Sequence, residues 1–135
     1  MNVLDANIPL EQRDLLQLSG VPCRLIGQNL AEPGIGDHGI IGLLHHLKQP
    51  TFFTRDVHFF YRHLCHAAYA LVYLDLAPEE CALFIRRFLK HPRFQTKAQR
   101  MGVVARVHHD GIHFWEKRRQ GLQAVPWLTR IGSLV

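Results

Sequence analysis

The alternation of short apolar runs with helical patterns is the feature that most constrains how this chain can fold. The apolar runs are continuous and rich in residues that favour strands. Strands of this kind are buried on both faces, which is typical of a parallel sheet covered by helices. The predicted strands span residues 1–4, 21–26, 51–54 and 70–76.

Helix-start signals mark the segments between the predicted strands. Pro9 suits the first turn of a helix, Asp37 precedes an apolar-patterned segment, and Pro78 is followed by two glutamates. The predicted helices span about residues 9–18, 38–48, 57–65 and 78–90. Strands and helices in this order predict an α/β domain with a mostly parallel central sheet.

The region after the last predicted helix has a different pattern. Val103–Val107 and Ile112–Glu116 are rich in strand-forming residues, and an Asp110-Gly111 pair lies between them. An Asp-Gly pair between two such runs is a strong signal for a β-hairpin. We therefore expect antiparallel strands here, while the residues from about Arg119 onward give no clear prediction.

Length and composition restrict the class of protein. A chain of 135 residues with 47% hydrophobic composition fits one domain with a substantial core. No signal peptide is recognisable, and the longest apolar stretch, Ala67–Leu74, is far shorter than a membrane span. Three cysteines without a C-x-x-C pair disfavour disulfides and a zinc site, so we expect a cytoplasmic protein that does not enter the membrane.

Charge is distributed unevenly along the chain. Residues 1–85 hold 5 basic and 9 acidic residues, whereas residues 86–135 hold 11 basic and 2 acidic residues. The second part could attract a polyanion while the first part holds a metal or other polar chemistry. A basic surface that only keeps the protein in solution explains the same numbers.

Several carboxylates follow predicted strands or open predicted helices. Asp5 follows the first strand, Asp56 follows the third, and Asp37 opens the helix between the second and third strands. The carboxyl ends of parallel strands meet at one edge of the sheet, where ligands bind. Acids that converge there repel one another unless a cation neutralises them, and oxygen ligands favour Mg²⁺ or Mn²⁺. Asp75, on the fourth strand, is a weaker fourth candidate.

Each of these acids also has a purely structural interpretation. Asp37 and Asp56 could be helix N-caps, and Asp5 could be a turn residue. The joint placement of all three at one sheet edge is what favours a metal site.

Histidine and aromatic residues are abundant but follow no standard site pattern. His63 and His66, three residues apart, could share a metal, although surface or packing roles suit them better. We interpret the aromatic residues of the third strand and of the segment after it as core side chains rather than base-stacking platforms. These are Phe52, Phe53, Phe59, Phe60 and Tyr61.

Three motifs, taken in order, resemble those of the PIN-like domains. They are the start Val3-Leu4-Asp5-Ala6-Asn7-Ile8-Pro9, the Gly36-Asp37 helix opening, and Phe53-Thr54-Arg55-Asp56-Val57-His58-Phe59. The match is to the short bacterial and archaeal PIN-like group related to toxin ribonucleases. The resemblance implies a three-layer α/β/α domain over residues 1–118, with a C-terminal β-hairpin at about 102–118 and a C-terminal extension over 119–135.

The chain departs from the group's pattern at the auxiliary acids. Ala6 replaces a glutamate, His38 replaces the acid after the helix-opening aspartate, and His58 replaces a second aspartate in the Thr-x-Asp segment. The core acids Asp5, Asp37 and Asp56 are retained. The substitutions put the strength of catalysis in doubt, and His58 itself is a candidate ligand for a metal or a phosphate.

The resemblance implies a metal-dependent endoribonuclease, such as the toxin of a toxin–antitoxin pair. Asp5, Asp37 and Asp56 would be the catalytic and Mg²⁺- or Mn²⁺-binding residues, with Asp75 and His58 as further candidates. RNA would be held by Arg55, Arg86, Arg87, Lys90 and Arg93. A cognate antitoxin and a second copy of the chain are the protein partners that such a reading implies.

Two other classes remain open. A PIN-like module without catalysis would bind a nucleic acid or a protein, and the missing auxiliary acids favour it. A receiver-like signalling domain also carries acids at strand ends, but no lysine follows a later strand in the expected place.

Overall fold

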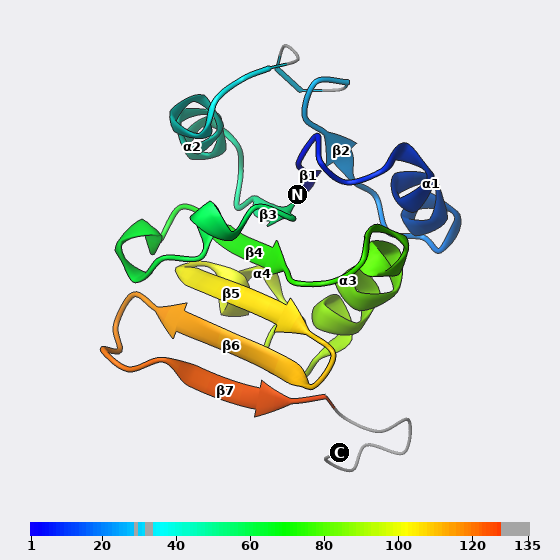
Figure 1. The fold of residues 1–135 in the computed structure, drawn as a ribbon. Coiled ribbons are helices and arrows are strands. Elements are labelled where there is room, and N and C mark those ends of the chain that lie inside the picture. Colours follow the sequence, from blue (N-terminus) through cyan, green and yellow to red (C-terminus); the bar gives the residue numbers. More distant parts are fainter. Residues whose placement is uncertain (29, 32–33, 128–135) are drawn as a thin grey trace.

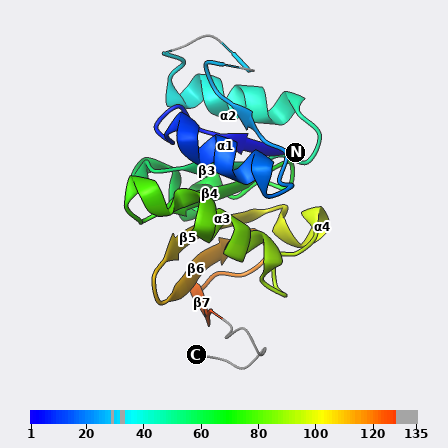
Figure 2. The same ribbon diagram turned by 90° about the vertical axis from the view of Figure 1, so that its right-hand side faces the viewer.

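One sheet of seven strands organises the described part of the chain, residues 1–28, 30–31 and 34–127 of the computed structural model. The strand order is β2-β1-β3-β4-β5-β6-β7. Helices α1 and α3 cover one face, and α2 with two short 3-10 turns covers part of the other (Figure 1). The view from the side shows α1 and α3 lying across the sheet (Figure 2). These layers confirm the predicted α/β class.

The strands and helices have the following bounds. The strands are β1 (Asn2–Leu4), β2 (Arg24–Leu25), β3 (Thr51–Thr54), β4 (Ala70–Leu74), β5 (Val103–His108), β6 (Gly111–Glu116) and β7 (Gln123–Pro126). The α-helices are α1 (Leu10–Leu18), α2 (Asp37–His46), α3 (Cys81–Lys90) and α4 (Lys97–Arg100). The 3-10 turns are η1 (Val57–Phe59), η2 (Arg62–Leu64) and η3 (Pro78–Glu80).

The first five strands pair in parallel, as the sequence predicts for the first four, and β5 adds a fifth parallel strand before the hairpin turns back. β1 lies between β2 and β3, and its register pairs Leu4 with Leu25 on one side and Phe53 on the other. β3 then pairs with β4, and β4 with β5, also in parallel. All these strands therefore end at the same edge of the sheet, which is called the carboxyl edge below.

Neighbouring residues of the central strands point into two separate cores. Val3 and Phe52 pack under α2, whereas Leu4 and Phe53 pack under α1 and α3. All four side chains are fully buried. Burial on both faces explains why these strands have no polar alternation in the sequence.

The helix predicted over residues 57–65 is wrong, because the structure has the two 3-10 turns η1 and η2 there. This segment crosses from the carboxyl edge, where β3 ends, to the opposite edge, where β4 begins. Phe59 anchors it by packing edge-on against Phe52, with 5.2 Å between ring centroids, whereas Tyr61 is 45% exposed. A run rich in aromatic residues has only a modest helix propensity, and anchoring on the core determines its path.

The sheet continues beyond β5 with antiparallel strands. β5 and β6 are joined through His109 and Asp110, and β7 pairs with β6 on the outer side. Residues 123–127, which the sequence places in a C-terminal extension, thus add a strand to the sheet, and Trp127 joins the core. Residues 128–135 of that extension lie outside the described residues.

Gly111 permits the close approach of β6 and β7, and we predict that Gly111→Ala destabilises the protein by about 1–3 kcal/mol. Its φ is +156°, and an added Cβ would lie 2.4 Å from the carbonyl oxygen of Val125. Gly42 is the matched control, because it lies inside α2 with nothing within 4 Å of an added Cβ. Gly42→Ala should stabilise the protein by about 0.5–1 kcal/mol. Urea unfolding of both variants measures the difference, and equal effects would contradict the prediction.

Candidate functional site at the carboxyl edge

Asp5 lies directly after β1 at the carboxyl edge and is only 9% exposed. Its backbone N–H donates to the carbonyl oxygen of Phe53, which extends the pairing of β1 with β3 by one residue. One carboxylate oxygen accepts from the backbone N–H of Ala6 at 2.7 Å, and the other accepts from the hydroxyl of Thr54 at 2.6 Å. Asp5 is also the first residue of a turn, since its carbonyl oxygen accepts from the N–H of Ile8.

The Thr54 hydroxyl is the centre of a polar network at this edge. While it donates to Asp5, its oxygen accepts from the backbone N–H of Asp56 at 3.0 Å and from the Asn7 side chain at 3.3 Å. The Asn7 side-chain oxygen in turn accepts from the backbone N–H of Arg55 at 3.1 Å. The hydroxyl therefore fixes the loop after β1 against the loop after β3.

Asp56 is the capping residue of η1, as one of its two interpretations predicts. Its carboxylate accepts from the backbone N–H of His58 at 2.9 Å, and the Nδ1 of the same histidine lies 2.8 Å from that oxygen. The Asp56 side chain is 30% exposed, and that of His58 is 69% exposed. Both side chains therefore still face solvent, and Nε2 of the imidazole is the nitrogen not used in this contact.

Asp37 is the first residue of α2, and Gly36 occupies the N-cap position. The interpretation of Asp37 as the N-cap is therefore wrong, because the structure places Asp37 one residue further on, in the first turn of the helix. The negative charges of Asp37 and Asp56 both act on Asp5. Burial raises the pKa of Asp5 above its ordinary value, the two neighbouring charges raise it further, and the hydrogen bonds from Thr54 and Ala6 oppose the rise.

Within the described residues, no group of three or more His, Cys, Asp or Glu side chains lies close enough to hold a metal ion. The three core acids thus interact through their charges without forming a tight cluster. His63 and His66 have different packing partners. His63 stacks on Tyr61, whereas His66 packs against His45 and Tyr69.

Asp75, the fourth candidate acid, is held in an ion pair. One of its carboxylate oxygens accepts from Nε and Nη2 of Arg106 at 3.0 and 2.8 Å. The charges that raise the pKa of Asp5 are those of Asp56 and Asp37, not that of Asp75. Its charge is therefore balanced within the sheet by the neighbouring strand β5.

Arg55 lies beside Asp56 at the end of β3 and is half-buried. Its Nε is buried and has no hydrogen-bond partner in the structure. Burial raises the pKa of the nearby Cys81 thiol to about 11, and the positive charge of Arg55 opposes that rise. Arg55 thus brings a cation with an unsatisfied donor to the carboxyl edge.

The basic residues predicted to bind RNA on and after α3 have different environments. Arg87 lies over the rings of Phe84 and Trp127, with 5.0 and 4.6 Å to their centroids. Arg93 lies beyond the helix, which ends at Lys90, and its guanidinium pairs with Glu116.

Arg86 is half-buried and Lys90 is exposed on α3. Because α3 ends at Lys90, Arg93 does not lie on the same helical face as these two residues.

Thr54 and Asn7 are the site residues that the sequence analysis did not identify. Both belong to the quoted motifs, Thr54 two positions before Asp56 and Asn7 two positions after Asp5. A hydroxyl or an amide at the carboxyl end of a buried strand was the available signal, because such groups satisfy the backbone and side-chain atoms of neighbouring loops.

Comparison with protein-family models, curated proteins and solved structures found no match to this chain. Within the described residues, no helix has the length and apolar character needed to cross a membrane.

We predict that Thr54→Val lowers the free energy of unfolding by about 1–3 kcal/mol, because it leaves several buried partners of the hydroxyl unsatisfied. The same change should raise the pKa of Asp5 further, since the hydrogen bond that stabilises its charged form is lost. Denaturant unfolding and an NMR titration of the Asp5 carboxyl carbon measure the two effects. Thr54→Ser retains the hydroxyl and is the control; equal stability of both variants would contradict the network.

Proposed function

We propose that the carboxyl edge of β1 and β3 is the site of a metal-dependent endoribonuclease of PIN-like type. The observation that carries the proposal is an uncompensated negative charge. Asp5 is buried beside the charges of Asp56 and Asp37, and no Lys, Arg or His of the described chain forms an ion pair with Asp5 or Asp37. A bound cation would balance these charges, because the buried Asp5 carboxylate is repelled by the neighbouring negative charges.

The donor atoms suit Mg²⁺ or Mn²⁺ in kind. Mg²⁺ is usually held by one or two carboxylates, with water and substrate phosphates completing its octahedral shell. Asp5 and Asp56, which are linked through Thr54, would hold the ion, and Asp37 would add charge from the start of α2. Such an ion would neutralise charge on a phosphate and lower the pKa of a nearby water.

The neighbouring side chains would assist with substrate. The half-buried guanidinium of Arg55, beside Asp56, would donate to a phosphate oxygen. Nδ1 of His58 contacts the Asp56 carboxylate. The other ring nitrogen of His58, Nε2, would therefore face the substrate or the ion. The three-layer arrangement and the antiparallel β5–β6 pair belong to the same PIN-like proposal.

A second candidate function is RNA binding without cleavage. The absence of a three-residue metal group within the described chain favours it, as does the replacement of the auxiliary acids by Ala6, His38 and His58. A cognate antitoxin or a second copy of the chain stays a prediction under both candidates. RNA cleavage separates the two.

We predict that Mn²⁺ raises the melting temperature of the wild-type protein. A ligand present at about 100 times its dissociation constant stabilises the folded state by about 2.7 kcal/mol. Asp56→Asn should lose most of this effect while its stability without metal stays within about 0.5 kcal/mol of wild type, because an asparagine oxygen still caps η1. Differential scanning calorimetry with and without Mn²⁺ is the measurement.

Asp14→Asn is the matched control, because Asp14 lies on α1 with 60% of its side chain exposed. It should respond to Mn²⁺ as wild type does. The same variants should be assayed on single-stranded RNA, where Asp56→Asn is expected to abolish Mn²⁺-dependent cleavage. An Asp56→Asn protein that gains as much stability from Mn²⁺ as wild type would refute the metal site, and RNA left intact by the Mn²⁺-bound wild type would favour the binding module.

The Mn²⁺ effect should depend on pH in a defined direction. Because the pKa of Asp5 is raised above 3.8, the folded state binds this proton more tightly than the unfolded state. Stability without metal therefore falls as the pH rises through the interval from 3.8 to the raised pKa. Protons and Mn²⁺ compete for the carboxylate, so the stabilisation by Mn²⁺ should grow over the same interval. Calorimetry between about pH 4 and pH 7 tests this, and a constant Mn²⁺ effect would exclude Asp5 as a ligand.

A further inference from the structure

Two neighbouring hollows meet at the end of β6. The larger, about 540 Å³, is lined by residues that include Arg93, Gln99, Glu116, Lys117 and Arg118. The smaller, about 460 Å³, is lined by residues that include Tyr61, Arg62 and His63. Glu116 and Lys117 line both hollows. The two hollows together therefore form one surface depression, which is called the β6 groove below.

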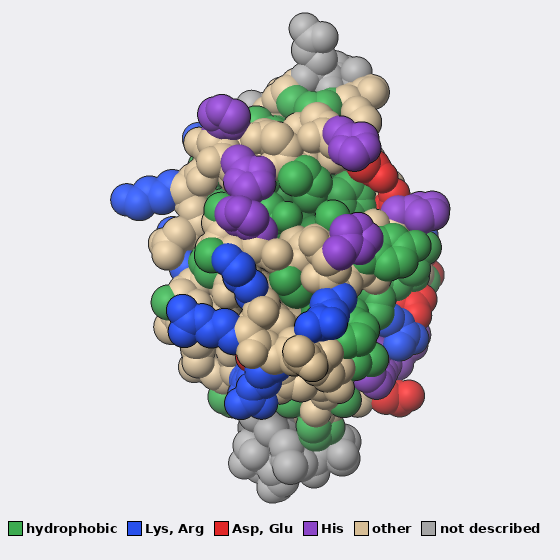
Figure 3. Space-filling view, turned by 90° about the vertical axis from the view of Figure 1, so that its left-hand side faces the viewer, with side chains coloured by type: hydrophobic (Ala, Val, Ile, Leu, Met, Phe, Trp, Pro, Cys, Tyr) green, Lys and Arg blue, Asp and Glu red, His purple; other side chains and the backbone are tan. Residues whose placement is uncertain are grey.

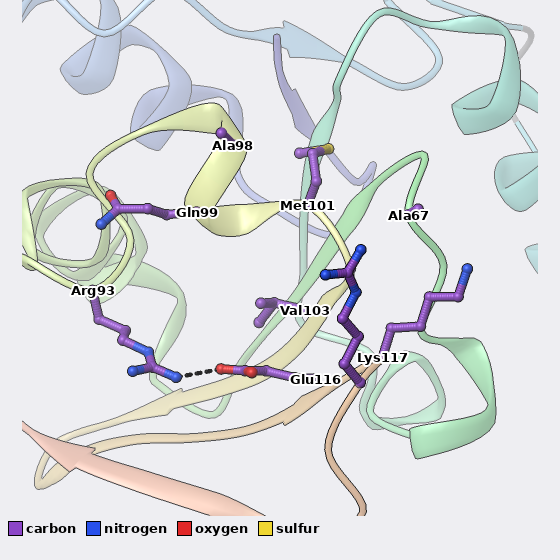
Figure 4. Close-up of a pocket in the computed structure, with 10 residues that line it drawn as sticks. Ala67, Arg93, Ala98, Gln99, Met101, Val103, Glu116 and Lys117 are labelled. Carbon is purple, nitrogen blue, oxygen red and sulfur yellow. Dashed lines mark hydrogen bonds and ion pairs between the residues drawn. The ribbon is translucent and has the colours of Figure 1, made fainter.

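The β6 groove carries an excess of positive charge. Its carboxylate, Glu116, pairs with Arg93 and lies 3.8 Å from Arg119. Figure 4 shows Glu116 pointing toward Arg93, whereas Lys117 extends away from that pair toward the loop at Ala67. No described carboxylate lies within 4 Å of a side-chain nitrogen of Arg62, Lys117 or Arg118. Three cations of the groove are therefore available to an outside anion.

The same groove presents an exposed aromatic surface. The rings of Tyr61 and His63 stack with 5.5 Å between centroids and 24° between planes, and Tyr61 is 45% exposed. The sequence predicts a core position for Tyr61, but its ring lies at the surface. Lysine and arginine side chains gather on the lower half of the face that carries this segment, and acidic side chains follow its right-hand edge (Figure 3).

We propose that the β6 groove binds a single strand of RNA, with phosphates on Arg62, Lys117 and Arg118 and a base on the Tyr61–His63 ring pair. Cations that follow a groove, together with an exposed ring on which a base can stack, are the combination that recognises single-stranded nucleic acid. A duplex keeps its bases stacked inside and cannot use the rings in this way. The chemistry of the groove therefore favours a single strand.

The position of the β6 groove deepens the proposed function and rests on it for the identity of the RNA as substrate. Tyr61 lies five residues after Asp56, on the segment that crosses the sheet from the carboxyl edge. A strand held in the groove would thus follow this segment toward the acids. The basic residues of α3 lie on the other face of the sheet from this segment. That is the face on which Phe84 and Phe88 of α3 are packed.

The first test compares two double variants that each remove two positive charges. Lys117→Ala with Arg118→Ala changes the groove, and Arg86→Ala with Lys90→Ala changes α3. Binding of a fluorescent single-stranded oligouridine is measured by anisotropy at several salt concentrations, in EDTA so that no cleavage occurs. Each lost phosphate contact flattens the logarithmic salt dependence by about 0.7, so the groove variant should flatten it by about 1.4 while the α3 variant keeps the wild-type slope. The reverse result would overturn the proposal.

The second test concerns the ring pair. Tyr61→Ala should weaken oligouridine binding about tenfold, because stacking of one base is lost, without changing the salt slope. Tyr61→Phe keeps the ring and should bind as wild type does. A duplex RNA of equal length should be insensitive to both changes. Equal binding of the single strand by Tyr61→Ala and wild type would overturn the assignment of the base to this ring.

The two proposals can fail separately. All groove variants should retain the stabilisation by Mn²⁺, since their side chains lie outside the acid network. Oligouridine binding that depends on the groove, in a protein without any Mn²⁺ effect, would sustain the groove and refute the nuclease site. A wild-type protein that binds Mn²⁺ but shows no oligouridine affinity at low salt would refute the groove and leave the metal site standing.

Discussion

The parallel pairing of β1 with β3 is the constraint on which the rest of the structure depends. It places Leu4 beside Phe53, and the residues that follow, Asp5 and Thr54, must then meet at the carboxyl edge. Their 2.6 Å hydrogen bond is a consequence of this register, since a shift by one residue would turn Asp5 and Thr54 toward opposite faces. Burial of both faces of these strands keeps the register fixed.

The two edges of the sheet differ in charge. The carboxyl edge collects acids after β1 and β3, and one arginine, Arg55, lies among them with an unsatisfied donor. The opposite end of β6 collects Lys117 and Arg118, whose charges no described carboxylate balances. The segment between β3 and β4 runs from one region to the other and carries His58 near its start and Tyr61 further on. A polyanion lying along this segment would meet the cations first and then the acids, where the proposed metal ion would bind.

Internal pairing separates the basic residues that are available to a ligand from those that are not. Arg106 balances Asp75, Arg93 balances Glu116, and Arg87 lies over two aromatic rings. Such contacts lower the capacity of these guanidinium groups to bind phosphate, because a ligand would have to replace them. A count of charges along the chain cannot distinguish the two kinds of residue.

The sequence by itself determined the α/β class, the parallel central strands and the segments that end at the carboxyl edge. These follow from local signals: continuous apolar runs such as Thr51–Thr54, helix starts such as Pro9, and the rule that parallel strands end together. Only the tertiary structure decided that η1 and η2 replace a helix, that β7 and Trp127 join the sheet and its core, and that Thr54 links Asp5 to Asp56. Each of these depends on tertiary contacts, such as Phe59 with Phe52, Thr54 with Asp5 and Gly111 with Val125. Local propensity carries no information on such contacts, because packing and strand register are settled by the whole core at once.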